Sequence, residues 1–155
     1  MPALIVFDLD LTLWHCGPLL WCDQLRTPLC KDKHGAIHDA DGVQVSLYTE
    51  VKELLDELAE NDVMMALASR TSAPQVARQL LEFFEISHHF PHQEIYPGDK
   101  TAHFAELKKA TGILYSEMAF FDDERRNIED VSSLGVQAHL VTRGMDKELL
   151  RKVIS

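Results

Sequence analysis

Short apolar runs recur along the chain at residues 3–7, 63–68, 117–121 and 136–141. They contain mainly aliphatic and aromatic residues without regular polar alternation, which is typical of strands buried on both faces in a parallel sheet. Each of the first three runs is followed by a residue with a hydroxyl or carboxylate side chain. The pattern therefore predicts a buried sheet with chemically active groups at its carboxyl edge.

Helical spacing replaces this pattern between the apolar runs. Apolar residues three or four positions apart at 51–58 and 76–84 predict two amphipathic helices that pack on the sheet. Ser72 and Gln75 have the spacing of a capping box, so the second helix is expected to begin near residue 73.

Three more helices are predicted in the second half of the chain. Gly112 and Gly135 stand where left-handed C-caps would close helices that begin near Thr101 and Arg125, and a last helix is expected over about 146–153. Strands and helices thus alternate, which predicts an α/β fold with a three-layer, Rossmann-like parallel sheet and helices on both faces.

Residues 14–46 break the alternation, and we call this segment the insertion. Within it, 36–39 and 43–47 flank a turn and are expected to form a small hairpin. The acidic turn at 39–42 lacks the spacing and the distal Glu of a Ca²⁺ loop, which favours an ordinary turn.

Composition narrows the class of protein. A chain of 155 residues fits a single domain over 1–155, and its net charge of −10 disfavours nucleic acid as a partner. No apolar run approaches the roughly 20 residues of a membrane span, so no membrane contact and a cytoplasmic location are expected. Cys16, Cys22 and Cys30 lack paired zinc-site spacing and are expected to be reduced thiols. We expect a monomer.

Paired carboxylates follow two of the predicted strands. Asp8 and Asp10 leave the first strand one residue apart, an arrangement that is electrostatically costly unless a cation neutralises it. Asp122 and Asp123 end the third apolar run, and three or four carboxylates at one sheet edge select Mg²⁺. The alternative is that these residues only cap helices.

Ser69 and Lys100 are weaker signals by themselves. Ser69 follows the second strand and offers a hydroxyl, with adjacent backbone N–H groups, to a phosphoryl oxygen near a helix N-terminus, although Ser at such a turn is often an ordinary cap. Lys100 is a single cation after a turn, and most such residues are solvated surface groups. Ser69 and Lys100 indicate a functional site only in combination with the other candidate residues.

In chain order, these residues resemble the four motifs of phosphatases of the haloacid dehalogenase superfamily. Within that superfamily the chain looks like a magnesium-dependent phosphatase. Four segments carry the resemblance: FDLDLTLW at 7–14, ASRTS at 68–72, EIYPG at 94–98 and FFDDERRNI at 120–128.

The resemblance implies roles for the carboxylates. Asp8 is expected to attack phosphorus and form an aspartyl-phosphate, while Asp10 acts as general acid and base. Mg²⁺ is expected to be held by the Asp8 carboxylate, the Asp10 backbone carbonyl and Asp123, with Asp122 behind them. An Asp rather than a Thr at position 10 favours hydrolysis over a long-lived phosphoenzyme.

The resemblance also implies how the phosphoryl group is held. Ser69 and the Arg70 backbone are expected to bind it, and Lys100 is expected to bridge it to Asp8. Thr12 is expected either to orient the Asp10 region by a hydrogen bond or to be an ordinary residue after a strand. Leu11 departs from the expected Tyr, which affects the substrate pocket rather than the metal chemistry.

The resemblance implies a largely open site, because the insertion is too short for a cap domain over it. It also implies phosphomonoester substrates, as phosphorylated small molecules or phosphoproteins: aryl phosphates that resemble phosphotyrosine, or phosphates of sugars and sugar amines. The alternative is a catalytically silent Mg²⁺-binding interaction module. A nucleic-acid 3′-phosphatase would need a basic track that the charge disfavours. Several aromatic and histidine residues in or beside the insertion either contact the leaving group or simply pack or face solvent: Trp14, His15, Trp21, His34 and His38.

Overall fold

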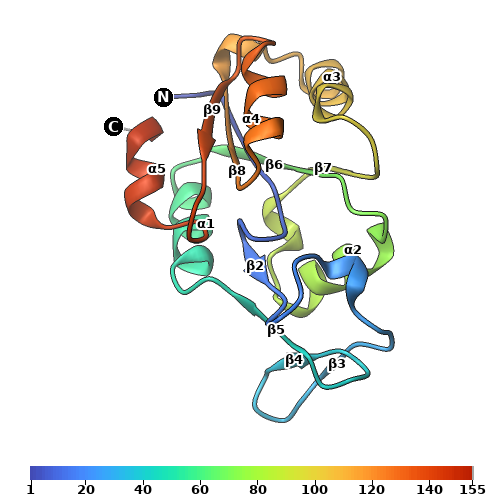
Figure 1. The fold of residues 1–155 in the computed structure, drawn as a ribbon. Coiled ribbons are helices and arrows are strands. Elements are labelled where there is room, and N and C mark those ends of the chain that lie inside the picture. The colour runs from blue at the N-terminus through green and yellow to red at the C-terminus, as the bar shows by residue number, and fades with distance from the viewer. Residues whose placement is uncertain (155) are drawn as a thin grey trace.

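The computed structural model describes residues 1–154 and contains a parallel five-stranded sheet, shown in Figure 1. Its strand order is β7-β6-β1-β8-β9, so the chain runs outward from β1 first to one edge and then to the other. The strands are β1 (Leu4–Phe7), β6 (Met64–Ser69), β7 (His92–Ile95), β8 (Met118–Asp122) and β9 (Gln137–Leu140). The order reverses between β1 and β8, the place where open α/β sheets bind ligands.

The central strand β1 is buried on both faces. Ile5 and Phe7 belong to one hydrophobic cluster, whereas Leu4 and Val6 belong to the other. Because successive side chains of a strand point to opposite faces, a strand covered on both sides needs apolar residues at every position. This explains the uninterrupted apolar run and confirms the predicted fold class.

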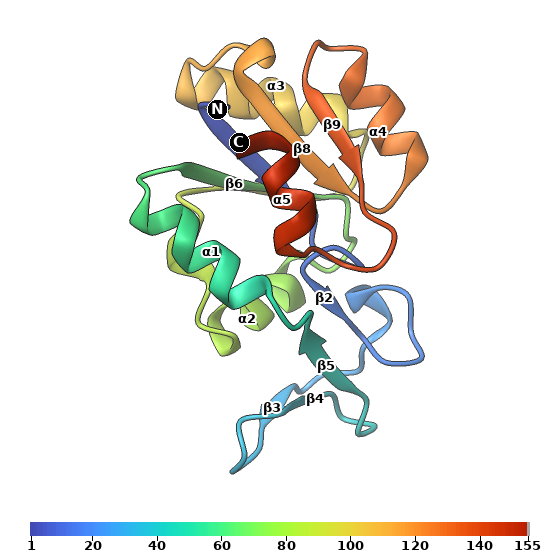
Figure 2. The ribbon, with the colours of Figure 1, turned by 90° about the vertical axis from the view of Figure 1, so that its left-hand side faces the viewer.

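Helices cover the two faces, as Figure 2 shows from the side. Apolar residues of α1 (Val51–Glu60), α2 (Pro74–Phe83) and α5 (Lys147–Ile154) join the Ile5 and Phe7 cluster. Apolar residues of α3 (Lys100–Thr111) and α4 (Arg125–Ser132) join the cluster on the opposite face. Three layers result, as the alternation of patterns predicted.

Two predicted helix ends need correction. The capping box was wrong: α2 has Ala73 at its N-cap with no side-chain cap, and the Ser72 hydroxyl instead donates to Asp23 Oδ2 at 2.8 Å. Gly112 is the left-handed C-cap of α3, as predicted. Gly135 has a φ of 102°, but α4 already ends at its C-cap Ser133, so Gly135 belongs to the following turn.

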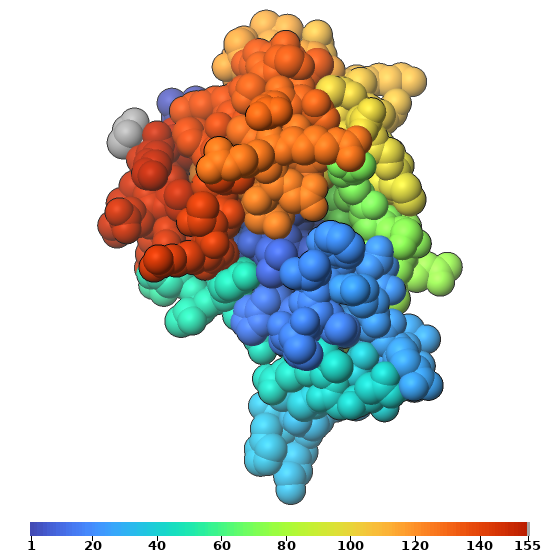
Figure 3. Space-filling view, viewed as in Figure 1, coloured from blue at the N-terminus to red at the C-terminus, as the bar shows by residue number. Residues whose placement is uncertain are grey.

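The insertion forms a second, antiparallel sheet of four strands in the order β2-β5-β4-β3. Its strands are β2 (Trp14–His15), β3 (Cys30–Lys31), β4 (Ile37–His38) and β5 (Gln44–Leu47), and a 3₁₀ turn, η1 (Cys22–Gln24), precedes β3. The predicted β4–β5 hairpin is confirmed. The β3–β4 end projects away from the main sheet in the ribbon and the space-filling views (Figures 1 and 3).

The acidic turn of the hairpin is an ordinary turn, as predicted. The Asp39 carboxylate accepts hydrogen bonds from the backbone N–H groups of Arg26, Asp41 and Val43 at 2.8 to 2.9 Å. These bonds occupy both carboxylate oxygens in holding the loop.

The described cysteines are free thiols, and no helix within residues 1–154 has the length and hydropathy to span a bilayer.

Gly144 is expected to be required for stability, because its backbone is left-handed, with a φ of 78°, and a Cβ there would overlap the Tyr48 ring. We expect Gly144→Ala to lower the free energy of unfolding by about 2 kcal/mol or more. Gly42→Ala is the matched control, since Gly42 has a similar φ of 83° but open space around it. Chemical denaturation that shows equal losses in both variants would contradict the steric argument.

Candidate active site

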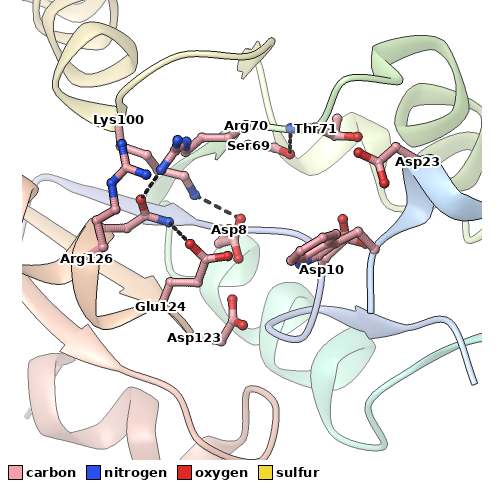
Figure 4. Close-up of a pocket in the computed structure, with 12 residues that line it drawn as sticks. Asp8, Asp10, Asp23, Ser69, Arg70, Thr71, Lys100, Asp123, Glu124 and Arg126 are labelled. Atoms are coloured by element: carbon pink, nitrogen blue, oxygen red, sulfur yellow. Dashed lines mark hydrogen bonds and ion pairs between the residues drawn. The ribbon is translucent and has the colours of Figure 1, made fainter. Parts of the chain in front are cut away.

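The carboxyl ends of three central strands meet at one pocket of about 360 Å³, drawn in Figure 4. Asp8 follows β1, Ser69 ends β6, and Asp122 ends β8. Parallel strands end at the same edge of a sheet, so residues far apart in sequence converge there. The structure brings together the segments that the sequence had singled out.

Lys100 is the buried cation at the base of this site. It is the first residue of α3 and only 1% exposed, so it is not a solvated surface group. Its Nζ donates to Asp8 Oδ1 at 2.9 Å, to Asp122 Oδ2 at 2.7 Å and to the Ala68 carbonyl at 2.6 Å. Burial by itself lowers the pKa of Lys100, but the two carboxylates raise it above its ordinary value.

Asp122 lies behind Asp8 and is fully buried. Besides the bond from Lys100, its carboxylate accepts hydrogen bonds from the Glu124 backbone N–H at 2.8 Å and from Asn127 Nδ2 at 3.1 Å. Burial and the charge of Asp8 raise the pKa of Asp122. The capping alternative is wrong for Asp122, because Glu124 is itself the N-cap of α4 and that helix has no side-chain cap; Asp122 instead holds Lys100 in place.

Three carboxylates form a group suited to a divalent cation. One oxygen each from Asp8, Asp122 and Asp123 lies within 4.8 Å of the others. Burial, followed by the hydrogen bond and charge of Asp8, raises the pKa of Asp123 to about 9. The negative charges of these carboxylates repel one another, and a bound Mg²⁺ relieves this repulsion. Because Mg²⁺ prefers hard oxygen ligands, the residues fit this ion. Within residues 1–154, the Asp10 backbone carbonyl accepts no backbone hydrogen bond, so it is also available as a ligand.

The metal-free protein is expected to lose stability as the pH rises. The pKa of Asp123 is about 9 in the fold against 3.8 for an unperturbed Asp, so the folded chain keeps a proton that the unfolded chain releases. The stabilisation by this proton is complete below pH 3.8, falls steadily as the pH rises between the two pKa values, and is gone above the folded value. Between pH 6 and 8 we expect Tm in a chelator to fall by about 3 °C or more, which corresponds to about 1 kcal/mol.

Added Mg²⁺ should largely remove this fall, because it binds the ionised carboxylates of the folded state. Asp123→Asn is the control, since it carries no titrating carboxyl at that position and should show a smaller loss in chelator. Equal losses in the variant and the parent chain would disprove the assignment to Asp123.

Asp10 lies beside Asp8 but belongs to a different hydrogen-bond network. The Trp14 indole N–H donates to Asp10 Oδ1 at 2.8 Å, and the Cys22 backbone N–H donates to the same oxygen at 3.1 Å. Burial raises the pKa of Asp10 to about 6, with a smaller rise from the charge of Asp8 and an opposing effect of the Trp14 bond. A carboxyl with this pKa can both give and accept a proton near neutral pH.

Ser69 and its neighbours form the opposite wall of the pocket. Ser69 is 2% exposed, and its Oγ accepts a hydrogen bond from the Thr71 backbone N–H at 3.3 Å. The Arg70 side chain turns to Asn127 Oδ1, at 3.1 Å from Nη1. The expectation for Thr12 needs correction: its hydroxyl donates to Asp8 Oδ2 at 3.3 Å, not to Asp10.

Sequence reasoning missed two residues that support this wall. Asn127 is 3% exposed and links Arg70 to Asp122. His103 is fully buried, and its Nε2 lies 2.9 Å from the Ser69 carbonyl and 2.8 Å from the Tyr96 carbonyl. Their positions one helical turn inside α4 and α3 place them on the faces toward the site, a signal available from helical spacing.

The rim of the pocket is chemically mixed. Trp21, which is 43% exposed, and Asp23 of the insertion both line the pocket. Arg126 and Glu124 lie on the opposite side from Asp23 (Figure 4). Trp14, by contrast, is fully buried. The histidines predicted to pack or face solvent lie outside the residues that line this pocket: His15 packs beside Tyr48, while His34 and His38 belong to the projecting hairpin.

A parallel sheet in this order, with carboxylates after its first strand and at the strand beyond the switch point, is typical of the haloacid dehalogenase type of fold. The family model of acid phosphatases matches residues 1–155. The chain therefore belongs to the acid phosphatase family, which confirms the predicted phosphatase of the haloacid dehalogenase superfamily.

Individual relatives agree with this assignment. Human magnesium-dependent phosphatase 1 is 48% identical over 151 residues, which cover 97% of this chain and 84% of that protein. A HAD-like hydrolase superfamily protein of Schizosaccharomyces pombe is 37% identical, over 87% of this chain and 83% of its own. L-2-haloacid dehalogenase from Xanthobacter autotrophicus shares the fold, with a TM-score of 0.65 at 12% identity over 98% of this chain and 82% of that one.

Proposed function

We propose that the chain hydrolyses phosphomonoesters through an aspartyl-phosphate on Asp8, with Mg²⁺ as the cofactor. The observation that carries the proposal is the environment of the Asp8 carboxylate. It lies at the pocket, accepts a hydrogen bond from Lys100 at 2.9 Å, and belongs to a group of three carboxylates suited to Mg²⁺. Phosphoryl transfer depends mostly on positioning and charge neutralisation, which this arrangement supplies.

In the first step, an Asp8 carboxylate oxygen attacks phosphorus and the bond from phosphorus to the leaving oxygen breaks. Asp10, protonated, gives its proton to that oxygen, so an alcohol or phenol departs. The raised pKa of Asp10, about 6, supports this role, because a useful fraction carries a proton near neutral pH.

In the second step, Asp10 is ionised and accepts a proton from a water molecule as that water attacks phosphorus. The bond between phosphorus and Asp8 breaks, which releases inorganic phosphate and restores both side chains. One proton has entered and left Asp10, so the cycle closes without another reactant.

The remaining residues hold charge and position. We assign Ser69 and the Arg70 backbone N–H to the transferring phosphoryl oxygens, and Lys100 to the charge shared between Asp8 and the phosphoryl group. The Asp8 and Asp123 carboxylates and the Asp10 carbonyl would hold Mg²⁺, which neutralises phosphoryl charge when bound. Asp122 and Thr12 orient Lys100 and Asp8 through the hydrogen bonds described above.

Aryl phosphates are the substrate class that the rim favours. Trp21 lines the pocket and is 43% exposed, and aromatic pairs contribute about 0.5 to 1.5 kcal/mol beyond simple burial. Sugar and sugar-amine phosphates are the second candidates, because Asp23 and Arg126 at the same rim offer polar contacts.

A phosphate-release panel on the purified chain tests the proposal, with aryl phosphates, sugar phosphates and phosphopeptides compared with and without Mg²⁺. We expect Mg²⁺-dependent release and a transient phosphoprotein that hydroxylamine cleaves, as it cleaves acyl phosphates. A folded chain without hydrolysis of any member would favour a silent binding module. Hydrolysis without a hydroxylamine-sensitive adduct would point to direct attack by water.

A further inference from the structure

Two N–H groups of the insertion bind the same oxygen of Asp10. The Trp14 indole N–H and the Cys22 backbone N–H both donate to Oδ1, at 2.8 and 3.1 Å. Trp14 and Cys22 are fully buried, whereas Asp10 lines the pocket. Neither of these N–H groups donates to the other oxygen, Oδ2.

We propose that Trp14 is a positioning residue that fixes which oxygen of Asp10 transfers the proton. A protonated carboxyl group has one carbonyl oxygen and one hydroxyl oxygen, and the carbonyl oxygen is the better acceptor. Two N–H donors on Oδ1 therefore place the proton on Oδ2. This inference rests on the proposed acid and base role of Asp10.

The position of Trp14 is itself fixed by packing. Its backbone pairs with Leu47 of β5, and its ring lies 6.1 Å from the ring of Phe84 at the end of α2. The Leu9 carbonyl accepts hydrogen bonds from the N–H groups of Thr12 and Leu13, which closes the tight turn between Asp10 and Trp14. Rotation of Asp10 away from this turn would leave a buried indole N–H without its partner, which is unfavourable.

The insertion therefore contributes to the active site even though it forms no cap domain. Both donors to Asp10 come from it, Trp14 from β2 and Cys22 from η1. The segment that lies beside the open pocket therefore also orients the proton-transferring group. Ser69, to which we assign phosphoryl binding, lies on the opposite wall of the pocket.

Trp14→Phe tests the inference, because it keeps a buried aromatic ring and removes the N–H. The readout is kcat/KM for a series from p-nitrophenyl phosphate to phenyl phosphate, which reports the steps up to departure of the phenol. We expect a loss of about 10- to 100-fold for phenyl phosphate and of less than about 3-fold for p-nitrophenyl phosphate. A good leaving group needs little protonation, so only the poor one reveals a misoriented acid.

Phe84→Leu is the matched control, because it disturbs the packing of the Trp14 ring without removing the N–H. We expect it to preserve the relative rates across the series. A Trp14→Phe protein whose rates fall equally for every substrate, or do not fall, would overturn the inference. Its failure is distinguishable from that of the proposed function: if Asp10→Asn turns over as fast as the unmodified chain, the role of Asp10 itself is wrong.

A direct measurement covers the case in which Trp14→Phe does not fold. In the unmodified chain, the indole N–H signal of Trp14 should exchange with deuterium much more slowly than that of Trp21, which is 43% exposed. Asp10→Ala should shift the Trp14 signal and speed its exchange while leaving the Trp21 signal unchanged. A Trp14 signal insensitive to Asp10→Ala would rule out the hydrogen bond on which the inference depends.

Discussion

Asp8→Asn is expected to lower kcat for p-nitrophenyl phosphate by at least about 10⁴-fold, the scale of loss that follows removal of a catalytic nucleophile. An amide is a far poorer nucleophile than a carboxylate. The substitution also removes one charge from the group of three carboxylates that fits Mg²⁺. Assays at saturating Mg²⁺ separate these two effects, because only weaker metal binding is restored by excess metal.

The Asp8→Asn protein should remain folded, so lost activity will report chemistry. Asn has the shape of Asp, and Lys100 keeps its bonds to Asp122 and to the Ala68 carbonyl. Asp39→Asn is the matched control: Asp39 is also a buried carboxylate, but it holds the hairpin turn outside the pocket. That control should lose stability and keep its kcat. Substantial Mg²⁺-dependent hydrolysis by Asp8→Asn would disprove covalent catalysis at this residue.

Apolar patterning predicted the central sheet because β1, β6 and β8 are buried on both faces. The strand β7 escaped prediction since it lies at an edge and reads His-Gln-Glu-Ile, with only Ile95 buried. An edge strand paired on one side has no need of a continuous apolar run. The strands β2 and β3 of the insertion escaped prediction for a related reason, because strands of two residues are too short to show a period.

The positions of Asp8 and Asp122 followed from the strands, but the burial of Lys100 did not. A Lys after a turn is by itself a surface group; the family resemblance implied its contact with Asp8, whereas its bond to Asp122 depends on the tertiary structure. The partner of Thr12 and the donors to Asp10 likewise depend on turn geometry. Sequence patterns predict which elements follow one another along the chain, whereas hydrogen bonds across the site depend on how loops close.

Asp10→Asn is expected to lower steady-state kcat by about 10² to 10⁴-fold, the contribution usual for a general acid and base. The geometry should survive, because the amide oxygen of Asn can accept the hydrogen bonds that Trp14 and Cys22 now donate to Asp10 Oδ1. The Asn amide nitrogen then replaces Oδ2, the oxygen that would transfer the proton. It can neither protonate a leaving group nor take a proton from water.

A sharper test asks which step Asp10→Asn slows more, formation of the aspartyl-phosphate or its hydrolysis. p-Nitrophenolate leaves with little assistance, so Asp10→Asn should still form the aspartyl-phosphate on Asp8 but hydrolyse it slowly. Rapid mixing should then show a burst approaching one p-nitrophenol per active site, followed by slow turnover, and intact-mass analysis should show a phosphorylated chain. The double variant Asp8→Asn, Asp10→Asn should give neither. A burst that persists in the double variant would place the covalent adduct on another residue, and full turnover in Asp10→Asn would show that the water is activated elsewhere.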